Sequence, residues 1–487
     1  MKHLPTTFID QMTPLLGETE AQIFFDSLAN ESLVSIRFNP LKAKKTDSQI
    51  ASSLNPVPWA SHAYYLPARH PFTFDPLFQA GNYYVQEASS MFIESALQQY
   101  IPHQTRDAFH PYVALDLCAA PGGKSTHLRS LLPDGAWLIS NEVIRSRSQI
   151  LAENMMKWGD PEVCVTNNDP SDFSHMTHLM DLIIADVPCS GEGMFRKDEG
   201  AIDEWSPAHV NLCVERQRRI ITDVWPSLKP GGLLLYSTCT YNIEENERNV
   251  QWICDELEGE ALVLDMDKSW NVLSSLAPEL SSLPVARFMP HKTKGEGFFC
   301  ALIRKKEGLV ETINYQVLMA KESKKAKKKQ ASKESTGRSS FEDVSRWLKT
   351  TEPYIMIPKG DLYTAVSRRH SSLVQYLYQN LRVHYAGVVL GEDKGKNFIP
   401  HQSLALSPLL DDEAFPSVEV NYKQAIAYLR REAVSLESEV ARGIVLLKYE
   451  GTPIGFVKNI GNRANNLYPQ EWRIRSSYTP DSIEHLF

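Results

Sequence analysis

The sequence of 487 residues contains seven cysteines but no C-x-x-C pair. An odd number of cysteines scattered along a long chain argues against a disulfide framework, and the missing paired spacing argues against a zinc site. We therefore expect no metal centre. Cysteines that stay free are typical of a reducing compartment, so we expect a cytoplasmic protein whose thiols are available for catalysis.

The sequence also lacks a signal peptide and any apolar run approaching the roughly 18 residues needed to span a bilayer. Asp10, Glu18 and Glu20 follow Lys2 too soon for a signal pattern. We therefore expect no membrane association. An excess of basic residues is missing too, since the net charge is -8, so any surface for nucleic acid must be local.

One stretch combines a buried strand with a loop suited to an active site. Residues 181–193, D-L-I-I-A-D-V-P-C-S-G-E-G, run from an apolar segment into an acid, a proline, Cys189 and a glycine-broken loop. Residues 231–241, G-G-L-L-L-Y-S-T-C-T-Y, form a second buried strand, which ends at Cys239. A lone cysteine at a strand end is usually core filling. Two parallel strands that both end in thiols favour chemistry instead, because open α/β sheets bind ligands at that edge.

The alternation of strands and helices around these loops is typical of a doubly wound sheet. Residues 113–117 predict a strand, and C-A-A-P-G-G-K-S-T, residues 118–126, predicts a small-residue loop that opens a helix. Gly122 and Gly123 allow a ligand to approach the backbone closely. The loop nearly matches a phosphate-binding P-loop, but Cys118 stands where that motif requires glycine, which disfavours nucleotide hydrolysis.

Acids follow the next two predicted strands of this domain. Residues 136–141 lead into Glu142, at the distance past the glycines where related folds place an acid that binds ribose hydroxyls. Residues 163–168 lead into Asp169. These strand ends outline a pocket for an adenosine-bearing ligand without a clear phosphate cradle. S-adenosylmethionine is such a ligand.

The length suggests roughly three domains, and shifts in composition predict their boundaries. We predict an N-terminal α+β domain over residues 1–110, a catalytic domain over residues 111–306, a basic flexible linker over residues 307–340 and a C-terminal region over residues 341–487. The linker is rich in lysine and poor in apolar residues. Such a segment buries too little surface to offset the entropy lost on ordering.

Three elements can be predicted with defined ends. Apolar spacing over residues 5–29 predicts two short helices with a break at Gly17. Residues 295–304 predict a last strand that closes the catalytic sheet. Residues 443–458 predict a hairpin that turns at Glu450 and Gly451.

Basic side chains near the predicted loops are candidates for contact with RNA. Arg37 lies on a predicted strand of the first domain, and Arg196 and Lys197 follow the Cys189 loop. Arg473 lies in a segment rich in Asn and Arg after the hairpin. Such residues bind phosphate and stack on bases, although a solvated face explains them equally well.

Three motifs together resemble those of a known enzyme family. D-L-C-A-A-P-G-G-K, D-V-P-C-S-G-E-G and S-T-C-T occur here in the order and spacing of the RNA (cytosine-5)-methyltransferases of the NOL/NOP/Sun family, with Val187 where alanine is usual. The N-terminal helices and residues 443–475 look most like members that act on bacterial small-subunit ribosomal RNA. The resemblance implies a class I, Rossmann-like α/β methyltransferase domain with a small N-terminal α+β domain and a C-terminal PUA-like β domain.

The resemblance also implies roles for individual residues. Cys239 would attack C6 of a cytosine, Cys189 would assist the elimination that releases the RNA, and Asp186 would hydrogen-bond the base near N3. The cofactor would be S-adenosylmethionine, held by Cys118, Ala119, Ala120, Pro121, Gly122, Gly123, Lys124, Glu142, Asp169 and Asp186.

Three other interpretations stay open on the sequence alone. One is a tRNA rather than a ribosomal RNA substrate. Another is a DNA cytosine-5 methyltransferase, in which the Pro-Cys thiol attacks, but the second thiol and the basic C-terminal β domain argue against it. The third is a non-catalytic ribosome assembly factor that binds the methyl donor, which the presence of both thiols disfavours. The expected partner is therefore RNA, either ribosomal RNA or the small ribosomal subunit.

Overall fold

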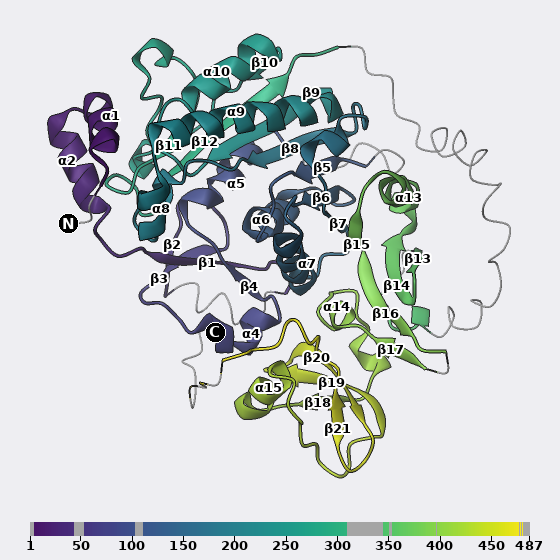
Figure 1. Cartoon of the computed structure of the whole chain (residues 1–487). Helices are drawn as coiled ribbons and strands as arrows, with labels where there is room; N and C mark the ends of the chain where they lie inside the picture. The colour runs from purple at the N-terminus through teal and green to yellow at the C-terminus, as the bar shows by residue number, and fades with distance from the viewer. Residues whose placement is uncertain are drawn as a thin grey trace.

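A nine-stranded sheet forms the centre of the molecule (Figure 1). Among the described residues, no helix is long and apolar enough to cross a membrane. Apart from its first two residues, the predicted linker over residues 307–340 lies outside the described residues, so it stays a prediction. The structure is a computed structural model that describes residues 4–42, 53–102, 111–308, 344–349, 353–395, 397–476, 478 and 480.

Parallel strands make the middle of this sheet, in the order β7-β6-β5-β8-β9. Because they are parallel, their carboxyl ends lie at one edge, where open α/β sheets bind ligands. The strands span Val113–Asp116 (β5), Trp137–Asn141 (β6), Val163–Thr166 (β7), Met180–Asp186 (β8) and Leu228–Thr238 (β9).

Antiparallel strands extend the sheet beyond β9. β12 (Phe298–Lys305) pairs with β9 and confirms the strand predicted at residues 295–304. It does not close the sheet, because β10 (Gly259–Ala261) and β11 (Ala286–Phe288) both pair with β12 on its other side.

Helices cover both faces of the central sheet. One face packs against helices α5 (Ile93–Gln98), α6 (Gly123–Leu131) and α7 (Arg145–Trp158). The other packs against α9 (Pro207–Val224), α10 (Glu247–Glu256) and α13 (Ser371–Asn380). Burial on both faces explains why the strands read as nearly continuous apolar runs in the sequence.

The N-terminal part consists of two helices and a small sheet. Helices α1 (Thr6–Leu16) and α2 (Glu18–Ser27) confirm the predicted pair, and Gly17 separates them with φ of 79°. The sheet has the strand order β2-β3-β1-β4, from Asn55–Pro56 (β2), Ala63–Leu66 (β3), Val34–Phe38 (β1) and Tyr83–Val85 (β4). After β4 the chain passes through a short 3₁₀ helix (Ser89–Phe92) to α5 on the catalytic sheet.

The C-terminal region adds one more strand to the central sheet. β15 (Val383–Ala386) pairs antiparallel with β7, at the edge opposite β12. Just before α13, the ring of His370 packs 4.9 Å from that of Trp137 on β6. These contacts correct the prediction that all strands of the sheet precede the linker.

The rest of the C-terminal region forms two smaller four-stranded sheets. One has the order β13-β14-β16-β17, from Tyr354–Lys359, Leu362–Ser367, Val388–Asp393 and Phe398–Pro400. The other has the order β18-β19-β20-β21, from Ser417–Glu419, Gly443–Tyr449, Thr452–Asn459 and Ala464–Asn466. β19 and β20 confirm the hairpin predicted to turn at Glu450 and Gly451.

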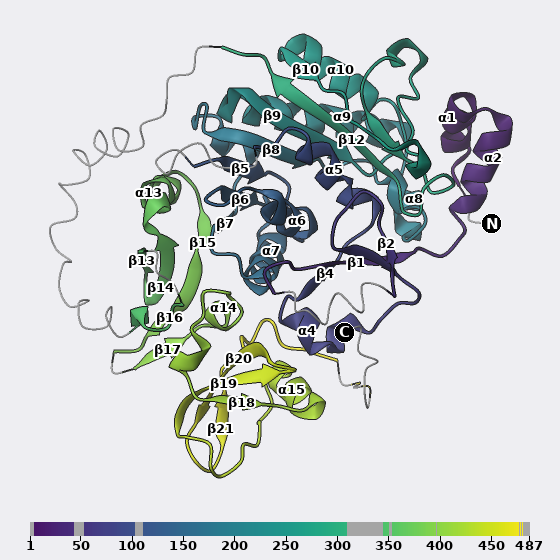
Figure 2. The ribbon, with the colours of Figure 1, turned by 180° about the vertical axis from the view of Figure 1, so that it is seen from behind.

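The two ends of the chain share one hydrophobic core. Ile36 and Phe38 of the N-terminal sheet pack in the same cluster as Val445 and Val457 of the C-terminal hairpin. Viewed from behind, the N-terminal sheet lies between the catalytic sheet and strands β18–β21 (Figure 2). The small domains are therefore packed against each other and against the catalytic domain.

Candidate active site

Two cysteine loops meet at the carboxyl edge of the central sheet. β8 ends at Asp186, and Cys189 follows in the next loop; β9 ends at Thr238, and Cys239 follows at once. Because β8 and β9 are parallel neighbours, with Asp186 beside Ser237, the two loops leave the sheet side by side. The sulfur atoms of Cys189 and Cys239 lie 3.1 Å apart, and both residues are half-buried free thiols.

The two thiols are not equivalent. The hydrogen bond with Cys239 is the largest of the effects that raise the pKa of the Cys189 thiol well above its ordinary value, and burial and the nearby Glu245 carboxylate act in the same direction. These effects favour the protonated form of Cys189. Cys164 and Cys300 are fully buried in the core.

Asp186 is held from both sides at the end of β8. Its Oδ1 accepts a hydrogen bond from the Ser237 hydroxyl at 2.8 Å, and its Oδ2 accepts one from Lys124 Nζ at 2.8 Å. Burial lowers the pKa of Lys124, but Asp186, Asp116 and Cys239 outweigh it and raise that pKa overall. Lys124 therefore stays charged and links the loop after β5 to the loop after β8.

A pocket of about 190 Å³ opens beside this pair. The loop from β5 to α6 forms one wall and contributes Cys118, Ala119, Ala120, Pro121, Gly123 and Lys124, and Asp186 also lines the pocket. Gly122 is the N-cap residue of α6 and has φ of 117°. No side chain caps this helix, so the amide groups of its first turn have no capping side chain as a partner.

The opposite wall comes from the N-terminal domain and was not predicted as part of the site. It consists of the segment from β4 into the next helical turn and contributes Tyr84, Val85, Gln86, Glu87 and Ser90. Part of the polar run Q-E-A-S-S is used locally, since the Glu87 carboxylate accepts hydrogen bonds from Ser89 N and Ser90 N, each at 2.9 Å. In the sequence, only the position of this polar run directly after a strand could have indicated that it also lines a pocket.

Glu142 and Asp169 lie at their predicted strand ends but outside the pocket lining. Glu142 is buried, and its carboxylate accepts a hydrogen bond from Ile144 N at 2.9 Å and lies 3.4 Å from Arg147 Nη1. Asp169 is 39% exposed and caps a short 3₁₀ helix through Ser171 N. Their contact with a cofactor stays a prediction.

The structure corrects the expectation that Arg37 and Arg196 face RNA. Arg37 is 2% exposed, and its guanidinium donates to Thr126 Oγ1 at 2.7 Å, so it braces the N-terminal sheet against α6. The Arg196 side chain is 5% exposed and donates to Ser27 O at 3.0 Å. Both cations are used inside the molecule and offer no surface to a polyanion.

Lys197 and Arg473 remain available at the surface. The Lys197 side chain is 35% exposed, with its Nζ 3.5 Å from Glu296 Oε1. Arg473 is exposed, just after the C-terminal β-sheet. Their contact with RNA stays a prediction.

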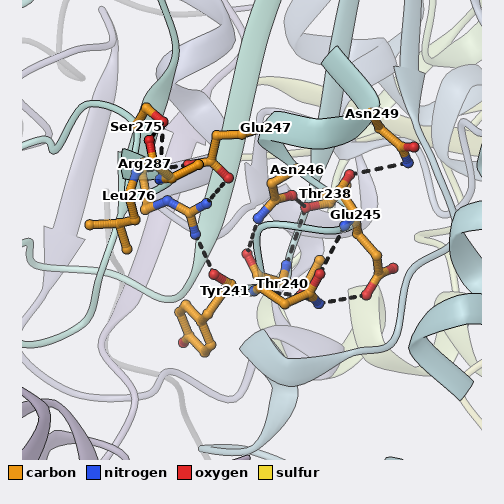
Figure 3. A network of polar contacts seen from close by, with 12 residues as sticks. Thr238, Thr240, Tyr241, Glu245, Asn246, Glu247, Asn249, Ser275, Leu276 and Arg287 are labelled. Carbon is orange, nitrogen blue, oxygen red and sulfur yellow. Dashed lines mark hydrogen bonds and ion pairs between the residues drawn. The ribbon is translucent and has the colours of Figure 1, made fainter. Parts of the chain in front are cut away.

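A polar network fixes the loop that carries Cys239 (Figure 3). The Asn246 side chain bonds the residues on both sides of the thiol: Thr238 Oγ1 donates to its Oδ1 at 2.6 Å, and its Nδ2 donates to Thr240 O at 3.0 Å. Further along, Arg287 donates to Tyr241 O at 2.6 Å and pairs with Glu247. The backbone around the thiol is therefore held by buried hydrogen bonds.

Models of protein families match three parts of the chain in order. The model described as "N-terminal domain of 16S rRNA methyltransferase RsmF" matches residues 4–88. "16S rRNA methyltransferase RsmB/F" matches residues 102–304, and "Methyltransferase RsmF PUA domain" matches residues 415–474. The fold class predicted from the sequence is thus confirmed, and the cofactor is S-adenosylmethionine.

The residues at the pocket fit this methyl donor. The sulfonium and ammonium groups of the donor are cationic, so carboxylates near the loop favour its binding. Burial is the main cause that raises the pKa of the Cys118 thiol, and the charges of Asp116, Asp186 and Glu142 add to it, in that order. The donor carboxylate matches the uncapped amides at the start of α6. The loop from Cys118 to Lys124, with Asp186, would therefore hold the donor.

Curated relatives match the chain over nearly their whole length. The chain is 27% identical to "Ribosomal RNA small subunit methyltransferase F" of Escherichia coli O9:H4, over 96% of both chains, and 28% identical to the protein of that name from Vibrio cholerae serotype O1, over 96% of this chain and 97% of the other.

A solved methyltransferase homologue from Pyrococcus horikoshii superposes with a TM-score of 0.51 at 26% identity, over 62% of this chain and 95% of the other. From its three family matches and its full-length relatives, we conclude that the chain belongs to the RsmB/F family of 16S rRNA methyltransferases, with the domain arrangement of RsmF.

Proposed function

We propose that the protein methylates C5 of a cytosine in small-subunit ribosomal RNA through a covalent bond between Cys239 and C6 of that base. The observation that carries this proposal is the 3.1 Å separation of the Cys189 and Cys239 sulfur atoms, beside the loop from Cys118 to Lys124 that would hold the methyl donor. One pyrimidine can contact both sulfur atoms at that separation. The names of the family and of its full-length relatives support ribosomal RNA as the substrate.

The two-thiol reaction answers a chemical problem of the substrate. Cytosine C5 is a poor nucleophile until a thiolate adds to C6 and gives C5 the character of an enamine. S-adenosylmethionine supplies an electrophilic methyl group when bound. Once C5 carries the methyl group, loss of the C5 proton and cleavage of the bond between C6 and sulfur restore the aromatic base and release Cys239.

The surroundings of the site support separate roles for its residues. The raised pKa of Cys189 favours its protonated form, which suits a part in the elimination step, and leaves Cys239 for the attack on C6. Asp186 is fixed by Ser237 and Lys124, which suits it to hydrogen-bond the cytosine edge near N3.

RNA affinity is proposed to come from surfaces around the site. The PUA domain is an RNA-binding module in this proposal, with exposed Arg473 near its end and Lys197 near the thiol loops. The protein would act in the cytoplasm, on ribosomal RNA or on the assembled small subunit.

The test is tritium release from 16S rRNA labelled at cytosine C5. Replacement of the C5 proton by a methyl group frees tritium into water, so wild-type protein with S-adenosylmethionine should release one tritium for each methyl group incorporated. Cys239→Ala should release none. Methyl incorporation without tritium release would rule out the C5 chemistry.

The same assay separates the other candidate activities. Tritium release from tRNA or from DNA, with none from 16S rRNA, would replace the proposed substrate. A non-catalytic assembly factor would bind the donor and the subunit without release from any of the three. Bisulfite mapping of ribosomal RNA from cells with and without the protein would identify the modified cytosine.

A further inference from the structure

The loop that carries Cys189 holds the loop that carries Cys239 through one buried carboxylate. Glu192 has no exposed surface. Its Oε2 accepts hydrogen bonds from Tyr241 N at 2.7 Å, from Asn242 N at 2.9 Å and from the Thr240 hydroxyl at 2.6 Å. A single carboxylate thus fixes three consecutive residues directly after Cys239.

A second buried carboxylate makes the opposite connection. Glu245 follows Cys239 in the chain, and its Oε2 accepts from Ser190 N, the amide next to Cys189, at 3.0 Å. The same oxygen accepts from Gln217 Nε2 at 2.7 Å, and Gln217 also donates to Pro188 O at 3.1 Å. The residues on both sides of Cys189 are therefore held from Glu245.

The two carboxylates are joined to each other and to the thiol backbone. Asn242 Nδ2 donates to Glu192 Oε1 at 3.0 Å and to Glu245 Oε1 at 2.8 Å. Gly193 N donates to Cys239 O at 2.7 Å, and a Cβ on Gly193 would lie 2.0 Å from that oxygen. The loops therefore approach as closely as their backbones allow.

Burial of two carboxylates raises the free energy of the folded state by several kcal/mol unless hydrogen bonds compensate. Apolar side chains could hold the two loops together without that cost, so the buried carboxylates need another explanation. Neither Glu192 nor Glu245 lines the pocket. Hydrogen bonds, unlike apolar packing, fix direction as well as distance. We propose that Glu192 and Glu245 are positioning residues that set the distance and orientation of the Cys189 and Cys239 sulfur atoms. This inference rests on the proposed two-thiol reaction.

Replacement of Glu192 by Gln tests this role with little change in volume. The five groups that bond Glu192 are all donors here: the amides of Tyr241 and Asn242, the Thr240 hydroxyl, the Asn242 side chain and the indole of Trp205. A glutamine amide would point its own N–H groups at some of these donors. The Cys239 loop should therefore move away from Cys189 while the fold persists.

The distance between the sulfur atoms can be measured without RNA or methyl donor. Phenylarsine oxide binds two neighbouring thiols at once, with loss of water, and intact-mass spectrometry detects the product. Wild-type full-length protein should form a product that survives excess monothiol, and Cys189→Ala should not. Glu192→Gln and Glu245→Gln should form it at least about tenfold more slowly, because the thiols are no longer prealigned.

Glu94→Gln is the matched control. Glu94 is also buried and surrounded by donors, from Ser61, Gln98 and His127, but it lies away from the thiol loops. It should lose stability while it captures the arsenical at the wild-type rate. Capture by Glu192→Gln and Glu245→Gln at the wild-type rate would overturn the proposal.

If either Gln variant fails to fold, Thr240→Val removes one contact to Glu192, and an unchanged capture rate in that variant would overturn the proposal too.

Turnover separates positioning from a role in binding or folding. For Glu192→Gln, kcat should fall about a hundredfold, since displacement of a reacting group by about 1 Å has that effect, and KM for RNA should stay within about threefold. A rise in KM with unchanged kcat would contradict the role. If instead Cys239→Ala were fully active, the proposed function would fail, while the arsenical result would still report on the loops.

Discussion

At the scale of single residues, Asp116 should make the stability of the folded protein sensitive to pH. Its side chain has no exposed surface, one oxygen accepts from Ser125 Oγ at 2.7 Å, and the other finds no donor among the described residues. Burial raises its pKa to about 7. The folded protein therefore keeps a proton that the unfolded chain loses near pH 4. Its free energy of unfolding should fall between about pH 4 and pH 7, by up to about 4 kcal/mol, and this contribution should be constant above pH 7.

Asp116→Asn isolates this contribution, because asparagine stays neutral throughout. Urea unfolding of both proteins without methyl donor should show the wild type losing stability relative to the variant as pH rises from about 4 to 7. Parallel curves for the two proteins would mean that Asp116 titrates normally.

Site residues could be predicted from the sequence only where the residues next to them in the chain form a recognisable pattern. Cys189, Cys239 and the Cys118 loop were found because each directly follows an apolar strand. Arg37 was misassigned because alternation places a side chain on a face without saying what covers that face, and here α6 covers it. Glu192 could not be found, since its partners lie about fifty positions further along the chain.

At the scale of secondary-structure elements, helix α13 should stabilise the catalytic sheet. Leu377 of α13 packs with the catalytic strands, whereas Leu390 of β16 packs within the C-terminal region, and both are fully buried. Each change to Ala should cost about 2–5 kcal/mol. Leu377→Ala should speed amide hydrogen exchange in β7 and β15, and Leu390→Ala should leave β7 protected. Equal exchange of β7 in both variants would contradict this coupling.

The catalytic strands were predictable as elements because burial on both faces gives each a run of apolar residues. β15 was not. Its sequence, V-H-Y-A, is short and only partly apolar, and its partner β7 lies more than two hundred residues earlier. Pairing over that separation depends on tertiary packing, which a local window of sequence does not contain.

At the scale of the whole molecule, the C-terminal region holds the rest of the chain at two separate places. β15 continues the catalytic sheet, and the hairpin of β19 and β20 shares a core with the N-terminal sheet. A protease site inserted between residues 309 and 343 should therefore give two fragments that elute together in size-exclusion chromatography and separate only in denaturant. Fragments that separate in native buffer would show that these contacts are too weak to hold the domains.

The proposed reaction depends on a covalent bond between Cys239 and the target cytosine, which is released with the help of Cys189. Its most direct test incubates Cys189→Ala with 16S rRNA and S-adenosylmethionine, followed by a denaturing gel and peptide mass spectrometry. A protein–RNA adduct should form that survives denaturation, is attached at Cys239 and is absent from Cys189→Ala/Cys239→Ala. Normal turnover by Cys189→Ala without an adduct, or an adduct attached at any other residue, would contradict it.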